Sequence, residues 1–140
     1  MGRDTVERLR EISSANLRIV ANERYKHTDT NVTAQVIKVV AAKPHVVFIA
    51  ASGAPAALPQ LELRQRGCTG KIYQSHGVTS KDFLRIGGKS VEGALIPVGP
   101  VLVAEQLSDA MARKKIGGDF NNVEEKANGA DSRSTFAGPA

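Results

Sequence analysis

The 140 residues contain one cysteine, no tryptophan and an aromatic fraction of only 4%. A single cysteine, Cys68, excludes an internal disulfide and a multi-cysteine metal site. No activating neighbour is evident beside it, so we interpret Cys68 as a tolerated residue rather than a reactive thiol. The low aromatic content leaves no obvious platform on which nucleic-acid bases could stack.

Long hydrophobic runs are also missing. No apolar stretch reaches the roughly 18–20 residues that a membrane-spanning helix needs. The first ten residues are rich in charge and contain no apolar core of the kind an export signal requires. As written, the chain is therefore expected to stay in the cytoplasm if it is expressed alone.

The formal net charge is +5 and the sequence pI is about 9.6, but the positive residues are scattered along the chain. The one compact basic run is Arg113-Lys114-Lys115. Scattered charge without interleaved aromatics is typical of solvated helix faces, so we predict no nucleic-acid partner.

The most informative segment that is present is the apolar run Val46–Ala51, which ends abruptly in Ser52-Gly53. A short apolar run bounded by turn residues suits a strand buried on both faces, as in a parallel sheet. Lys71–Ser75 repeats the pattern and leads into His76-Gly77. The sequence therefore predicts two parallel strands with polar and small residues at their carboxyl ends.

Helical and extended patterns alternate along the rest of the chain. We predict helices over 4–16, from about 30 to 42, from about Pro59 to Arg66, over 82–86 and over 109–127, and strands over 17–24, 45–51, 71–75 and 91–97. In the last helix, Ile116, Phe120 and Val123 are expected to point inward. This alternation predicts an α/β fold: a three-layer αβα lobe with a mainly parallel sheet. Residues 1–128 are expected to form a single lobe, and 129–140 a loose C-terminal tail.

In open α/β sheets, ligands bind just beyond the carboxyl ends of the strands. The candidate ligand-binding residues are accordingly Ser52, Gly53, Ala54, Ser75, His76 and Gly77. His76 has two interpretations that the residues alone leave open: a loop histidine that bonds a backbone carbonyl, or a ligand contact that donates to a carboxylate or accepts from an ammonium.

The sequence does not contain the catalytic and cofactor-binding motifs that its glycines, serines and histidines could suggest. No Gly-x-Gly-x-x-Gly occurs, and Gly88-Lys89-Ser90 lacks the upstream glycine of a phosphate-binding loop, because Phe83 stands there. The three histidines lack the spacing of metal ligands. Adjacent residues of a strand point to opposite faces, so Ser75 and His76 are not expected to pair as nucleophile and base. We predict no catalysis, no cofactor and no metal.

A family resemblance extends over nearly the whole chain. It is carried by Glu23–Tyr25, Asp29-Thr30, Thr33–Val36, Ala41–Pro44, Ala51–Pro59, Gly70–Tyr73, His76–Val78, Asp82–Arg85, Val91–Leu95 and Pro97–Gln106. In these segments the sequence resembles the substrate-binding proteins of branched-chain amino acid ABC transporters. The resemblance implies a type I periplasmic binding fold, in which two α/β lobes close on an amino acid or similar small carboxylate and then dock on membrane permease subunits.

The same resemblance places ligand contacts near Ser52-Gly53 and at His76. Relatives that bind aliphatic amino acids often carry an acidic residue at the position of His76, so histidine there suits an acidic or aromatic carboxylate better. Both ends of the chain look shortened relative to the family, as if it held most of the second lobe alone. The implied location is the periplasm.

Three further expectations follow. A lone lobe supplies about half of the ligand contacts, so the isolated chain is expected to bind ligand weakly or not at all. An incomplete sheet exposes unpaired backbone groups, so self-association is expected. The alternative function is a cytosolic sensory or effector-binding domain of a regulator with the same fold; an α/β enzyme is disfavoured because catalytic constellations are missing.

Overall fold

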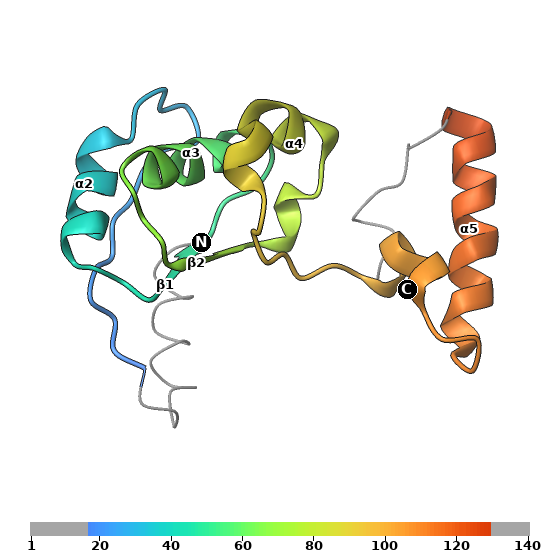
Figure 1. Cartoon of the computed structure of the whole chain (residues 1–140). Helices are drawn as coiled ribbons and strands as arrows, with labels where there is room; N and C mark the ends of the chain where they lie inside the picture. Colours follow the sequence, from blue (N-terminus) through green and yellow to red (C-terminus); the bar gives the residue numbers. More distant parts are fainter. Residues whose placement is uncertain (1–16, 130–140) are drawn as a thin grey trace. The chain divides into compact units, whose positions relative to one another are not determined.

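The computed structural model describes residues 17–129 (Figure 1). The helix predicted over 4–16 and all but the first residue of the predicted tail lie outside these residues. Contacts divide the chain into two compact units, Met1–Leu95 and Ile96–Ala140. The expectation of a single lobe over 1–128 stays a prediction.

The first unit is built on the parallel pair β1 (Val46–Ile49) and β2 (Lys71–Gln74), in which Val46 lies opposite Lys71 and Ile49 opposite Gln74. This confirms the two predicted strands and their direction. The strand predicted over 91–97 is reduced to a single parallel bridge, between Tyr73 and Leu95. Helix α2 (Thr33–Ala41) precedes β1, and helix α3 (Ala57–Gln65) connects the two strands.

Helices α2 and α3 lie over one side of the sheet (Figure 1). The core between them contains Val32, Val36, Ile49, Leu63, Cys68 and Ile72. On the other side of the sheet, the side chains of Val46 and Phe48 are 51% and 44% exposed. The prediction that this strand is buried on both faces is therefore wrong for the part of the chain that the structure describes, because only alternate residues of β1 face α2 and α3.

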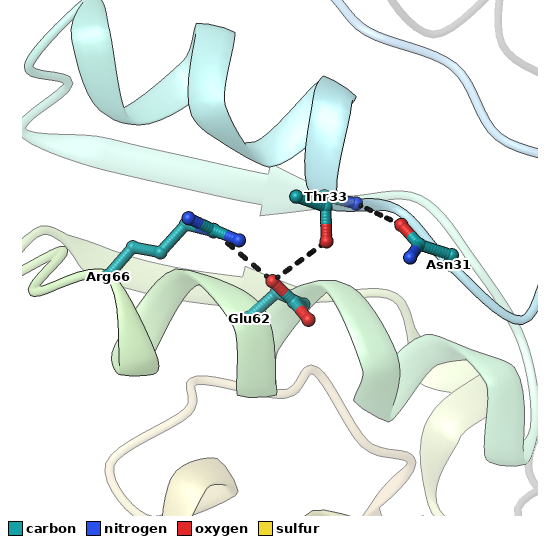
Figure 2. A network of polar contacts seen from close by, with 4 residues as sticks. All are labelled: Asn31, Thr33, Glu62 and Arg66. Atoms are coloured by element: carbon teal, nitrogen blue, oxygen red, sulfur yellow. Dashed lines mark hydrogen bonds and ion pairs between the residues drawn. The ribbon is translucent and has the colours of Figure 1, made fainter.

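A polar network joins α2 to α3 above the sheet (Figure 2). The Asn31 side-chain oxygen accepts from the Thr33 backbone N–H at 2.9 Å, which satisfies one free donor at the start of α2. The Thr33 hydroxyl donates to Glu62 at 3.4 Å, and Arg66 donates to the same carboxylate oxygen at 3.2 Å. Two helices separated in sequence are thus tied together around one carboxylate.

Local stop signals fix the ends of α3. A short 3-10 turn, η1 (Ala54–Ala56), leads into the helix, which begins at Ala57 rather than near Pro59 as predicted. Pro59 is tolerated because it lies in the first turn, where backbone N–H groups have no helical partner. At the other end Gly67 has φ +74° and the Cys68 N–H bonds the Leu63 carbonyl at 2.9 Å. This is a Schellman arrangement, as the predicted glycine stop implies.

The chain then continues through η2 (His76–Val78), α4 (Lys81–Gly87) and η3 (Gly88–Val91). Helix α4 confirms the short predicted helix, and the Ser80 hydroxyl caps it by accepting from the Phe83 N–H at 3.2 Å. The strand predicted over 17–24 is not formed: within the described residues, this segment has no ladder partner. It is held instead by side chains of α2, including Lys38, which pairs with Glu23 at 3.1 Å.

The second unit consists, in its described part, of η4 (Pro100–Gln106) and helix α5 (Ala112–Asn128). The buried residues of α5 are Gly117 and Asn121. Asn121 donates to the Val101 carbonyl at 2.8 Å, and a Cβ at Gly117 would lie 3.0 Å from the Ala104 Cβ. The prediction that Ile116, Phe120 and Val123 point inward is wrong, because η4 packs on a neighbouring face of the helix that has no large apolar side chain.

Candidate ligand-binding site

The segments that follow β1 and β2 are hydrogen-bonded to each other. The Gly53 N–H donates to the Gly77 carbonyl at 2.9 Å, and the Ser75 N–H donates to the Ile49 carbonyl at 3.2 Å. The Ser75 hydroxyl donates to the Ala51 carbonyl. Parallel strands end at the same edge of a sheet, so residues more than 20 positions apart meet here. The structure therefore brings together the two predicted strand ends.

Glycine is required at this meeting point. A Cβ built on Gly77 would lie 2.9 Å from the Ser52 Cβ and 3.5 Å from the Ser52 Cα, which is tighter than side chains tolerate. Gly53 has φ +64°, a conformation that favours glycine. The loop after β2 has no side chain at Gly77, and the loop after β1 turns through Gly53 in a left-handed conformation. Both features are needed for the two loops to lie against each other.

His76 is the first residue of η2, and its side chain is exposed. Its carbonyl accepts from the Thr79 hydroxyl at 2.9 Å. That bond uses the backbone carbonyl and does not involve the imidazole, which remains exposed. Ser52 is also exposed, whereas Ala54 opens η1 and is half-buried.

Sequence reasoning missed a second histidine at this edge. The Nε2 of His27 lies 3.1 Å from the Ser52 carbonyl oxygen. A carbonyl only accepts, so Nε2 carries the proton and the neutral ring would present Nδ1 as an acceptor. The contact joins residues 25 positions apart and depends on how the segment before α2 passes the end of β1. No local pattern in the sequence signals it.

A buried amide pair lies at the end of β2. The Gln74 Nε2 donates to the Gln60 Oε1 at 2.9 Å and to the Ala56 carbonyl at 3.3 Å, and both glutamine side chains are fully buried. The Gln60 Nε2 in turn donates to the Ser90 carbonyl at 3.0 Å. These bonds tie β2 to α3 and η3, which fixes the position from which Ser75 and His76 leave the sheet.

Two titratable groups among the described residues have a displaced pKa. Burial raises the pKa of the Tyr25 phenol, and a hydrogen bond from Lys114, with its charge, lowers the pKa of Asp109. Tyr25 packs against the core, and Asp109 belongs to the second unit.

Within residues 17–129 no three His, Cys, Asp or Glu side chains converge as a metal site needs, and no helix could cross a membrane. An open hollow of about 410 Å³ lies along α5, between Met111 and Asn122, away in sequence from the strand ends.

Residues 1–132 match the family profile described as periplasmic binding protein. The chain belongs to the periplasmic binding protein family. This confirms the periplasmic binding protein fold and the incomplete α/β lobe predicted from the sequence. A comparison with curated proteins finds no match.

Several solved structures are similar to this chain. Rp1789 of Rhodopseudomonas palustris strain CGA009 shares 46% identity with a TM-score of 0.85, covering 96% of this chain and 37% of that one. An extracellular ligand-binding receptor of the same species shares 49% identity with a TM-score of 0.79, covering 86% and 34%. A third, an extracellular ligand-binding receptor of strain HaA2, shares 46% identity with a TM-score of 0.84, covering 96% and 37%. The chain thus spans little more than a third of the length of these solved structures.

Proposed function

We propose that the strand-end residues form one wall of a ligand cleft in a solute-binding component of an ABC transporter. The ligand would be a branched-chain amino acid or a related small carboxylate. The observation that supports this is the bonded pair of strand-end loops, with Ser52 and His76 exposed on it, in a chain 46–49% identical to extracellular ligand-binding receptors. The protein binds and releases its ligand without chemical change.

The exposed groups favour an anionic ligand end. An imidazole at His76 donates to a carboxylate, and protonation strengthens that bond. The Gly53 N–H is already bonded to the Gly77 carbonyl, so it is not a free donor for the ligand. Ser52 and His76 are therefore the two residues of this wall that we expect to touch the ligand, while Gly53, Ala54, Ser75 and Gly77 shape the surface behind them.

The second wall of the cleft belongs to the other lobe of the fold. The chain covers 31–37% of the length of the structures it matches, and a cleft between lobes buries most of the ligand surface. Losing half of the ligand contacts should cost several kcal/mol of binding free energy, which corresponds to orders of magnitude in affinity. The isolated chain then binds weakly, and full affinity and docking on permease subunits require the complete fold. The relatives' description as extracellular receptors supports a periplasmic location for that complete protein.

A nuclear magnetic resonance titration of the isolated chain tests the site. Leucine, glutamate and benzoate are each raised to about 20 mM, where a millimolar ligand saturates. We expect shifts confined to residues 52–54 and 75–77, larger for benzoate or glutamate than for leucine, and a loss of at least about fivefold in affinity in His76→Ala.

The matched control is His45→Ala, because His45 is also exposed and lies at the opposite end of β1. It should leave the titration unchanged. Shifts elsewhere on the chain, or equal effects of the two histidine substitutions, would contradict the proposed site. Micromolar binding by the lone chain would contradict the requirement for a second wall.

We also propose self-association of the isolated chain. Among residues 17–129, only a single bridge, at Leu95, pairs with the outer edge of β2, and one sheet face exposes Val46, Phe48 and Tyr73. Unpaired strand edges and exposed apolar faces favour contacts between copies.

A further inference from the structure

A third segment of the chain reaches the two loops of the candidate site. Residues 26–29 form a β-turn, in which the Asp29 N–H donates to the Lys26 carbonyl at 3.0 Å. The same turn is closed a second time, because the Lys26 N–H donates to the Asp29 carboxylate at 2.8 Å. His27 is the first of its two central residues. The turn therefore holds His27 at a fixed corner of the backbone.

This corner contacts the loop that follows β1. The His27 Nε2 lies 3.1 Å from the Ser52 carbonyl oxygen. Ser52 also lies against the loop that follows β2, since a Cβ built on Gly77 would be 2.9 Å from the Ser52 Cβ. Ser52 thus contacts both His27 and the residue next to His76. The exposed rings of His27 and His76 therefore belong to two segments that meet at one residue of the candidate site.

The bond to Ser52 fixes which nitrogen of the His27 ring is an acceptor. A carbonyl oxygen only accepts, so Nε2 carries the proton and the neutral ring has its lone pair at Nδ1. Among residues 17–129 no hydrogen bond to Nδ1 is found, and His27 is exposed. Nδ1 is therefore open to a donor from outside the protein. A carboxylate has no donor, so it is not the group that this nitrogen selects.

We propose that His27 is a specificity-determining contact of the ligand site, which accepts a hydrogen bond at Nδ1 from the ligand. The preferred ligand is then a small carboxylate that also carries a donor group, a hydroxyl or an ammonium. His76 donates to the carboxylate, and His27 accepts from the donor group. A ligand without a donor is disfavoured, because closure of the cleft would leave Nδ1 buried and unpaired. The inference rests on the proposed function and assigns a ligand chemistry to the same site.

Three carboxylates with one carbon skeleton test this preference: leucine, its α-hydroxy analogue, and the analogue with hydrogen in place of the ammonium group. Each is titrated by nuclear magnetic resonance into the 140-residue chain, up to about 20 mM, at pH 8, since the acceptor role requires a neutral imidazole. Leucine, the hydroxy acid or both should bind at least about threefold more tightly than the plain acid. The acid that shows the preference identifies the donor as an ammonium or a hydroxyl.

One substitution separates acceptance of a ligand donor from positioning of the loop. The indole of His27→Trp keeps an N–H at the ring position of Nε2 but has a carbon at the ring position of Nδ1. The ratio of affinities between the donor-bearing acid and the plain acid should therefore fall to about one, whatever happens to the absolute affinities. A positioning role alone predicts an unchanged ratio, because the donor to Ser52 is kept. His45→Trp, at the opposite end of β1, is the matched control and should keep the preference.

The ring nitrogens of His27 give a second measurement, on the unmodified chain. The ¹⁵N resonance of Nδ1 should move upfield when the preferred acid binds and stay in place with the plain acid. An unmoved resonance, or a preference that survives in His27→Trp, overturns the role of His27. Equal affinities for the three acids, with shifts at residues 52–54 and 75–77, overturn that role and leave the proposed function standing. Absence of shifts at these residues with all three acids overturns both.

Discussion

Gln74 and Gln60 form a hydrogen bond of 2.9 Å, from Nε2 to Oε1, between two side chains with no solvent exposure. Gln74 is the last residue of β2, and the next two residues, Ser75 and His76, begin the second loop of the candidate site. An amide pair in a core constrains geometry more than apolar packing does, because its bonds are directional. The pair therefore fixes where the second loop of the site begins.

Removing one member of this pair should be costly. Gln74→Leu leaves the Gln60 Oε1 and the Ala56 carbonyl buried without their donor, which should lower the free energy of unfolding by about 1–3 kcal/mol. Urea denaturation measures it, with Gln65→Leu, an exposed position at the end of α3, as control. The double variant with Gln60→Leu should cost less than the sum of the single variants, since both partners are then gone. Additive costs would mean that the two side chains do not act as a pair.

The sequence predicts elements whose signals are local. The parallel direction of β1 and β2 follows from their apolar patterns and the intervening helix, and the end of α3 follows from Gly67. The strands predicted over 17–24 and 91–97 fail because a strand needs a neighbour, and the residues themselves do not say whether one is available. Pairing with a neighbouring strand, and not the intrinsic strand propensity of these residues, decides whether such a segment becomes a strand.

The candidate site shows the same division. The two loops could be predicted because parallel strands must end at one edge. The contact of His27 with Ser52 and the burial of Gln74 could not, since each depends on a partner 25 or 14 residues away. The prediction that Ile116, Phe120 and Val123 point inward is wrong for a related reason: periodicity identifies one face of a helix but not what covers that face.

Gly77 should not tolerate a side chain. In Gly77→Ala the new methyl group would meet the Ser52 Cβ at 2.9 Å, and relief requires the two loops to separate. We expect a loss of about 1–3 kcal/mol in the free energy of unfolding. The control is Gly118→Ala in α5, where nothing lies within 4 Å; it should stabilise the helix by about 0.5–1 kcal/mol. Equal outcomes for the two glycines would contradict the close approach of the loops.

His27 should act on the site without contributing much to stability. Its Nε2 donates to the Ser52 carbonyl from an exposed position, so His27→Ala should change the free energy of unfolding by less than about 1 kcal/mol. The Ser52-Gly53 turn should nevertheless loosen, and the Gly53 amide should exchange with solvent several-fold faster. His27→Gln retains a donor of similar reach and should restore slow exchange, whereas His45→Ala should leave it unaltered. Unchanged exchange in His27→Ala would show that the contact does not hold the turn.

Tyr25 should make the protein less stable in alkali. Burial raises the pKa of its phenol above the ordinary value of 10.0, so the folded state holds the proton more tightly than the unfolded state does. As the pH rises past about 10, the phenol of the unfolded state loses its proton while that of the folded state keeps it. The free energy of unfolding should therefore fall from about pH 10 upward, until the folded phenol also ionises. Within the described residues the buried hydroxyl has no hydrogen-bond partner, so Tyr25→Phe should be neutral or slightly stabilising at pH 7. Denaturation curves measured between pH 7 and about pH 11 give the free energy of unfolding at each pH. Its decrease with pH should become smaller in Tyr25→Phe but not in Tyr73→Phe, because Tyr73 is exposed. A slope that survives in Tyr25→Phe would assign the alkaline loss to another group.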